Sequence, residues 1–185
     1  MTNAPNILMI AGNTRHAGKT TLACGIIRKF RTHYPIIGLK VTNVKTGDEA
    51  FHGNHSGEAK TPWYVFEETD HSGQKDTSQM LQSGAERVFF IRAAEPSLKK
   101  AFNQFNKLIP PGCLIVCESR SLRQLVKPGI FIILLRDVEP VIAKDVSEYI
   151  VLADEICSHG YDPKEIDNII SRIQVIDNQW YLNIK

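Results

Sequence analysis

The sequence lacks three features that would place the protein in a membrane, in an oxidising compartment or on nucleic acid. No apolar run approaches the roughly 20 residues that a helix needs to cross a bilayer. Residues 1–6 carry neither the basic nor the apolar region of a signal peptide. The net charge of +2 is too small to indicate binding to nucleic acid. We therefore expect a cytoplasmic protein that binds neither membranes nor nucleic acids.

Cysteine is scarce, and its spacing gives no disulfide framework. The four cysteines are Cys24, Cys113, Cys117 and Cys157. Cys113 and Cys117 lie close enough in sequence to form half of a zinc site. Such a site needs two more ligands, and Cys24 and Cys157 lie in separate segments without a C-x-x-C partner. We interpret all four as buried apolar thiols.

In place of these features the sequence has an ordinary composition, 43% hydrophobic and 23% charged, arranged as alternating strands and helices. Residues 6–11 form an apolar run typical of a buried strand, residues 19–31 show helical spacing, and residues 34–41 indicate a second strand. A βαβ unit of this kind predicts a parallel sheet. We expect a single doubly wound α/β domain over residues 1–185, with helices on both faces of a mostly parallel sheet.

The rest of the chain continues this alternation after one long polar segment. Residues 43–74 are rich in glycine and histidine, and we interpret them as an insertion that faces a substrate or acts as a switch, with a short strand at 63–66. Helices are expected at 76–84, 97–108 and 162–172, and strands at 87–91, 113–117 and 130–135. Residues 146–152 fit a helix or a strand, and residues 174–184 fit a strand or the edge of a hairpin.

The strongest motif lies between the first strand and the first helix. It reads Gly12, Asn13, Thr14, Arg15, His16, Ala17, Gly18, Lys19, Thr20, Thr21. Glycine lets backbone amides approach an anion, and the following helix presents its unpaired N–H groups to the same place. Lys19 adds a positive charge for the β- and γ-phosphates, and the Thr20 hydroxyl can ligate Mg²⁺.

This segment differs from the common P-loop pattern by one residue. Asn13 stands where glycine is expected, and Gly12 precedes it, which lengthens the loop. Asparagine tolerates left-handed backbone angles, so it can replace glycine here. We predict a P-loop that binds ATP or GTP through residues 12–21 with Mg²⁺ as the metal, and with Lys19 and Thr20 as catalytic residues.

Four further residues are candidates for the same site, because ligands gather at the carboxyl ends of parallel strands. Glu118 follows the strand at 113–117, and we expect it to face the metal and act in catalysis rather than be merely solvated. Asp76 begins a predicted helix, so metal contact and helix capping are both open. Lys40 ends the second strand and can contact phosphate or remain an exposed cation. Arg120 is a candidate for the transferred phosphate.

The long loop, Lys40, the segment 73–77 and Glu118 together resemble the molybdopterin-guanine dinucleotide biosynthesis adaptor proteins of the MobB type. The resemblance covers about the first two-thirds of the chain. It implies a homodimeric α/β nucleoside triphosphatase that binds GTP and Mg²⁺ and assists maturation of the molybdenum cofactor. It also implies that Lys19, Thr20, Asp76 and Glu118 are the nucleotide and metal residues.

Dethiobiotin synthetase is similar at the same positions, with Thr14 in a comparable place in the loop and strand-end residues like Lys40 and Glu118. This second resemblance implies ATP-dependent activation of a carboxylate. Three functions therefore stay open. They are a slow triphosphatase with a small-molecule or cofactor-assembly protein partner, an ATP-dependent ligase or kinase, and a nucleotide-binding adaptor without hydrolysis.

Overall fold

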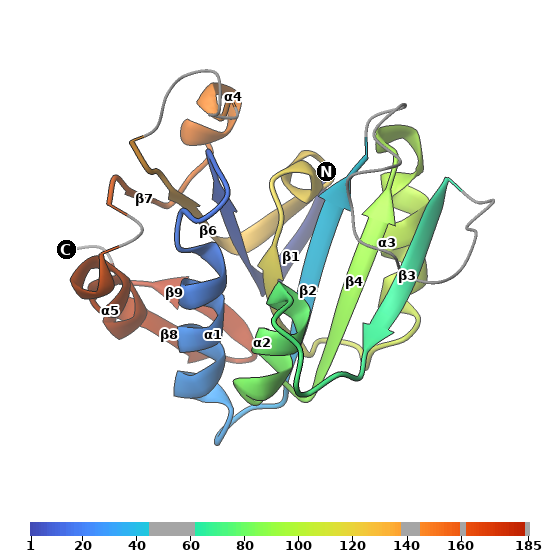
Figure 1. Cartoon of the computed structure of the whole chain (residues 1–185), viewed down its shortest axis with the longest axis horizontal. Coiled ribbons are helices and arrows are strands. Elements are labelled where there is room, and N and C mark those ends of the chain that lie inside the picture. Colours follow the sequence, from blue (N-terminus) through green and yellow to red (C-terminus); the bar gives the residue numbers. More distant parts are fainter. Residues whose placement is uncertain (45–61, 138–144, 160–161, 184–185) are drawn as a thin grey trace.

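A computed structural model of the chain describes residues 1–44, 62–137, 145–159 and 162–183. Its centre is a seven-stranded sheet with the order β3-β4-β2-β5-β1-β6-β7 (Figure 1). The strands are β1 Thr2–Gly12, β2 Ile36–Asn43, β3 Trp63–Glu68, β4 Arg87–Ala93, β5 Leu114–Glu118, β6 Val126–Leu134 and β7 Glu155–Cys157. All neighbours pair in parallel except β3, which runs antiparallel to β4. The predicted mostly parallel sheet is thus confirmed.

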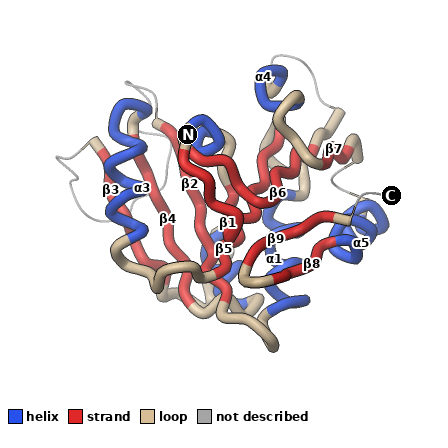
Figure 2. The backbone as a smooth tube through the Cα atoms, turned by 180° about the vertical axis from the view of Figure 1, so that it is seen from behind, coloured by secondary structure: helices blue, strands red, loops and turns tan. Residues whose placement is uncertain are grey.

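Helices cover both faces of this sheet, as predicted. They are α1 Lys19–Phe30, α2 Asp76–Gln82, α3 Leu98–Asn106, α4 Ser147–Ile150 and α5 Pro163–Arg172. Helices α1, α2 and α5 lie on one side of the sheet (Figure 1), and α3 lies on the other side, which faces the reader in Figure 2. Short 3-10 helices occupy Glu95–Ser97 and Ser121–Gln124. None of the helices in the described ranges combines the length and apolarity needed to span a bilayer.

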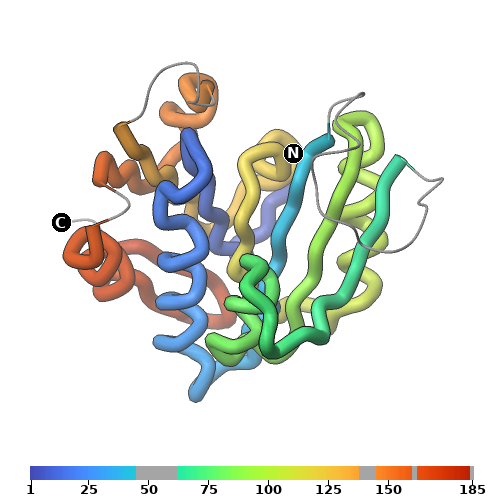
Figure 3. Tube along the Cα trace, viewed as in Figure 1, coloured from blue at the N-terminus to red at the C-terminus, as the bar shows by residue number. Residues whose placement is uncertain are grey.

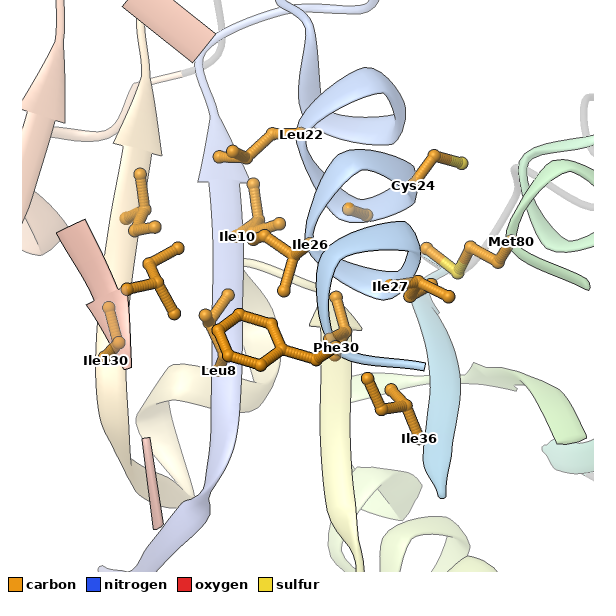
Figure 4. Packing of buried hydrophobic residues seen from close by; sticks show 14 of the residues in the cluster. Leu8, Ile10, Leu22, Cys24, Ile26, Ile27, Phe30, Ile36, Met80 and Ile130 are labelled. Carbon is orange, nitrogen blue, oxygen red and sulfur yellow. The ribbon is translucent and has the colours of Figure 1, made fainter. Parts of the chain in front are cut away.

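Successive side chains of the central strands enter two separate hydrophobic cores, which is why these strands read as continuous apolar runs. Leu8 and Ile10 of β1 pack against Ile26 and Phe30 of α1 in the first core (Figure 4). The second core, on the other face, joins alternate residues of the same strands to α3. Its members include Ile7, Met9, Ile115, Phe102 and Phe105.

The chain ends in a two-stranded hairpin, β8 Ile173–Ile176 and β9 Gln179–Leu182, which settles the open alternative for this segment. Its turn residues Asp177 and Asn178 both have positive φ, as a tight two-residue hairpin turn requires. Trp180 anchors the hairpin: its ring is buried, meets Phe30 edge-on at 5.2 Å, and donates from Nε1 to the Asn6 carbonyl at 3.0 Å.

The structure resolves one alternative, adds one strand and moves one boundary. Residues 146–152, which fitted a helix or a strand, contain a short helix, α4. Strand β7 was not predicted, because three residues paired on one side only with β6 carry no detectable periodicity. The predicted insertion begins later than expected, since β2 continues to Asn43, and most of it, including His52 and His55, lies outside the described residues.

Candidate functional site

The loop between β1 and α1 has the backbone form of an anion site. It lies where β1 ends and α1 begins, at the carboxyl edge of the sheet (Figure 3). Gly18 caps α1 with left-handed angles, φ 88° and ψ 4°, and His16 is also left-handed with φ 60°. The first turn of α1 contains no acidic side chain. Its N–H groups and the positive end of the helix dipole are therefore directed into the loop.

Gly12 is required by close packing rather than by its backbone angles. A β-carbon at this position would lie 2.8 Å from the Leu134 carbonyl oxygen and 3.3 Å from Cδ of Lys19. The absent side chain lets β1 approach β6 and leaves room for Lys19 to fold over the loop. The Lys19 ammonium donates to the Thr14 carbonyl at 2.6 Å.

The other loop residues are partly buried against the domain and partly exposed to solvent. Thr14 and Ala17 are buried, whereas Arg15 and His16 are exposed. Thr21, which was predicted to bind nucleotide, is exposed on the outer side of α1, where it lines two open depressions beside α5 and α2. Their volumes are about 430 and 490 Å³.

Asn13 joins the loop to the end of β6 through both ends of its amide. Its Nδ2 donates to the Arg136 carbonyl at 2.9 Å, and its Oδ1 accepts from the Arg136 N–H at 3.0 Å. The Arg136 guanidinium in turn donates to the His16 carbonyl at 3.2 Å. The Asn13 side chain therefore fixes the loop to the end of β6. The sequence indicated only that its backbone tolerates left-handed angles, and did not predict this role.

Four of the predicted site residues meet beside this loop. Thr20 Oγ1 donates to Asp76 Oδ1 at 3.0 Å. The Lys40 ammonium donates to Glu118 Oε2 at 3.1 Å and also to Asp76 Oδ2. Lys40 and Glu118 are register partners on adjacent strands, so their side chains leave the same face of the sheet. Glu118 is 2% exposed, and its Oε1 is buried with no hydrogen-bond partner.

The charges of this cluster stabilise one another. Burial by itself would lower the pKa of Lys40, but the carboxylates of Glu118 and Asp76 outweigh it and hold the pKa above its ordinary value. Burial by itself would raise the pKa of Asp76, but the Lys40 ammonium outweighs it and holds that pKa below its ordinary value. The cluster thus contains one cation and two carboxylates.

Asp76 is held in place from the neighbouring strand. The buried carboxylate of Glu68, at the end of β3, accepts hydrogen bonds from Thr77 Oγ1 at 2.7 Å and from the N–H groups of Thr69 and Asp70 at 3.1 and 3.0 Å. These bonds fix the first turn of α2. The Asp76 carboxylate accepts hydrogen bonds from Thr20 and Lys40, and it does not cap α2.

Some sequence candidates lie elsewhere. The Arg120 guanidinium donates to the Asp145 carbonyl and lies 5.7 Å from the centre of the Tyr149 ring, and its contact with a transferred phosphate stays a prediction. Cys117 is fully buried, and burial raises the pKa of its thiol. Within the described ranges, no three His, Cys, Asp or Glu side chains group as a metal site.

The strand register also brings together a row of three polar side chains that the sequence did not predict to be neighbours. Thr42 pairs with Arg92, which pairs with Tyr64, on the same sheet face as Lys40 and one row further along. The Arg92 guanidinium bonds the Tyr64 hydroxyl, while its buried Nε has no hydrogen-bond partner. These three residues come from β2, β4 and β3, and only the strand order shows that they are neighbours.

Comparison of the chain with protein-family models, with curated proteins and with solved structures gave no match.

Proposed function

We propose that the protein binds a nucleoside triphosphate together with Mg²⁺ at residues 12–21 and hydrolyses it slowly. One observation carries this proposal: the Thr20 hydroxyl, on the first turn of the helix that follows a glycine loop, is hydrogen-bonded to a carboxylate, Asp76, with a second carboxylate, Glu118, beside it. A phosphate-binding loop and a set of oxygen ligands for a hard cation then adjoin one another.

The loop supplies the contacts that phosphate requires. The N–H groups at the start of α1 offer hydrogen bonds and a positive dipole, and the Gly18 backbone opens the turn toward them. The Lys19 ammonium already lies over the loop, against the Thr14 carbonyl, and it is the side chain that would neutralise charge on a bound phosphate. Asn13 keeps the loop fixed against β6.

The residues present fit Mg²⁺. Thr20, Asp76 and Glu118 all offer oxygen, the ligand type that this cation prefers. The buried Oε1 of Glu118 has no hydrogen-bond partner, and a metal ion would satisfy it. When bound, the metal would supply positive charge to phosphate oxygens as they become more negative in hydrolysis.

We expect turnover to be slow. Arg120, the arginine nearest to Glu118 in sequence, donates to the Asp145 carbonyl. Stabilisation of the transition state then rests on Lys19 and the loop N–H groups, and an additional cation from a partner would raise the rate. Assistance to molybdenum-cofactor assembly, a homodimer and the choice between ATP and GTP stay predictions.

A second candidate function is transfer of phosphate to another substrate. The row Thr42, Arg92, Tyr64 favours it, because a guanidinium with a buried Nε lacking a hydrogen-bond partner lies on the same sheet face as Lys40. An anionic second substrate would find both cations on one surface. Release of inorganic phosphate without any acceptor supports hydrolysis, whereas turnover that requires an added acceptor supports transfer.

The test is a thermal-shift panel of ATP, GTP and their diphosphates, each with and without Mg²⁺. The proposal predicts that at least one triphosphate raises the unfolding temperature and that Mg²⁺ increases the effect. At a nucleotide concentration a hundred times Kd the expected stabilisation is about 2.7 kcal/mol. A panel without any shift would contradict nucleotide binding.

A further inference from the structure

Lys40 occupies the position between the two carboxylates. Its ammonium donates to Glu118 Oε2 at 3.1 Å and to Asp76 Oδ2. Glu118 comes from β5 and Asp76 from α2, and Lys40 comes from β2, which lies next to β5 in the sheet (Figure 1). One side chain thus bridges the acidic groups of two other elements.

The two carboxylates need a cation between them. Glu118 is 2% exposed, so water does little to screen it. Two like charges in a partly buried cluster repel each other, and a buried carboxylate left without a partner is strongly destabilising. The lysine therefore holds Asp76 and Glu118 together, each with one oxygen on the ammonium.

The same oxygens are the ones that a divalent cation would use. Mg²⁺ binds carboxylate oxygens at about 2.0–2.1 Å in a rigid octahedral arrangement. An ammonium and such a metal ion cannot share the space between Asp76 and Glu118. The Lys40 ammonium donates to Oε2 of Glu118 and leaves the buried Oε1 without a hydrogen bond. The lysine therefore satisfies only some of the hydrogen bonds that this carboxylate can accept.

We propose that Lys40 is an exchangeable internal cation. It keeps Asp76 and Glu118 in place as metal ligands while no metal is bound, and a divalent cation enters only when the ammonium leaves the carboxylates. This inference rests on the proposed function for the identity of the metal site. It adds that the protein binds a divalent cation weakly without nucleotide, because the metal has to displace a charge that is already paired.

The first test measures Mn²⁺ binding to the full chain without nucleotide, from the electron paramagnetic resonance signal of free Mn²⁺ at mildly alkaline pH. Lys40→Met should bind Mn²⁺ at least about tenfold more tightly than the parent, since two charges no longer have a competing partner. Lys127→Met, which removes an exposed lysine from β6, is the matched control and should bind like the parent. Equal or weaker Mn²⁺ binding by Lys40→Met overturns the proposal.

A second test does not depend on the folding of that variant. In the parent, the nitrogen-15 signal of the Lys40 ammonium is assigned by its loss in Lys40→Arg, which retains the charge. Titration with Mg²⁺ alone should shift this signal as the ammonium leaves the carboxylates, and an unchanged signal at saturating Mg²⁺ contradicts the exchange. Neither test contains nucleotide, so failure of nucleotide binding in the thermal panel is distinguished from failure of this inference.

Discussion

Thr20 in α1 and Asp76 in α2 are joined by a hydrogen bond of 3.0 Å although 56 residues separate them in sequence. The bond links the helix that follows the glycine loop to the helix that lies beside β2 and β4. Glu118 extends it to the carboxyl end of β5, and Lys40 extends it to β2, where it lies three residues before the end of the strand rather than at the end as expected. Substitution of any of these four residues is therefore expected to alter one shared site.

Lys19→Ala should abolish the thermal stabilisation that triphosphate gives. The side chain lies over the loop, and its removal takes away the one full positive charge there that is assigned to the β- and γ-phosphates. Differential scanning fluorimetry with ATP and GTP measures the effect, with Lys127→Ala on the exposed surface as control. Unaltered shifts in Lys19→Ala would count against the assignment of the loop.

Glu118→Gln should weaken the dependence of nucleotide binding on Mg²⁺ while the fold is retained. Glutamine has nearly the same shape, but it lacks the negative charge that a divalent cation requires. The Mg²⁺ concentration for half-maximal stabilisation should rise by about tenfold or more. Glu148→Gln, on exposed α4, is the control. The metal role is refuted if Glu118→Gln and the parent show the same Mg²⁺ dependence.

Gly18→Ala and Gly112→Ala should separate backbone strain from binding. Both glycines have positive φ, 88° and 72°, and nothing lies within 4 Å of a β-carbon at Gly112. Each substitution should lower the free energy of unfolding by about 1 kcal/mol in urea denaturation, because alanine is strained at these angles. Gly18→Ala should also lose nucleotide binding, and Gly112→Ala should keep it. Equal binding by both variants would show that the Gly18 turn does not contact the ligand.

Glu68→Gln should change the dependence of stability on pH. Burial by itself would raise the pKa of Glu68, but the hydrogen bonds from Thr77 and two backbone N–H groups outweigh it and hold the pKa below its ordinary value. A carboxylate with a lowered folded pKa stabilises the protein above its unfolded pKa, and this contribution is lost as pH falls through the folded value.

The free energy of unfolding of the parent should therefore exceed that of Glu68→Gln by a constant amount above about pH 5, and the difference should shrink below about pH 4. Urea denaturation at a series of pH values measures both proteins. Parallel curves throughout the acid range would mean that Glu68 does not hold the start of α2 in its ionised form.

The sequence alone was sufficient for the elements whose signals are local. The loop at residues 12–21 lies between an apolar run and a helical pattern, so β1, α1, Lys19 and Thr20 could be placed without knowledge of the tertiary structure. The central strands were also predictable, because a strand buried on both faces is apolar throughout.

Contacts between distant segments could not be obtained this way. Asn13 and Arg136 are 123 residues apart, and their paired hydrogen bonds depend on β6 lying next to β1. Lys40 meets Glu118 because β5 lies between β2 and β1, an order that no local pattern encodes. Glycine at position 12 was expected for phosphate access, and the structure adds that it permits the approach of the Leu134 carbonyl.

The most direct measurement is a crystal structure of the full chain grown with Mg²⁺ and a non-hydrolysable triphosphate. The account predicts β- and γ-phosphate oxygens on the N–H groups of the 12–21 loop and on Lys19, with the metal on Thr20. A triphosphate bound elsewhere, or a loop that stays closed around the Lys19 ammonium at saturating ligand, would contradict it.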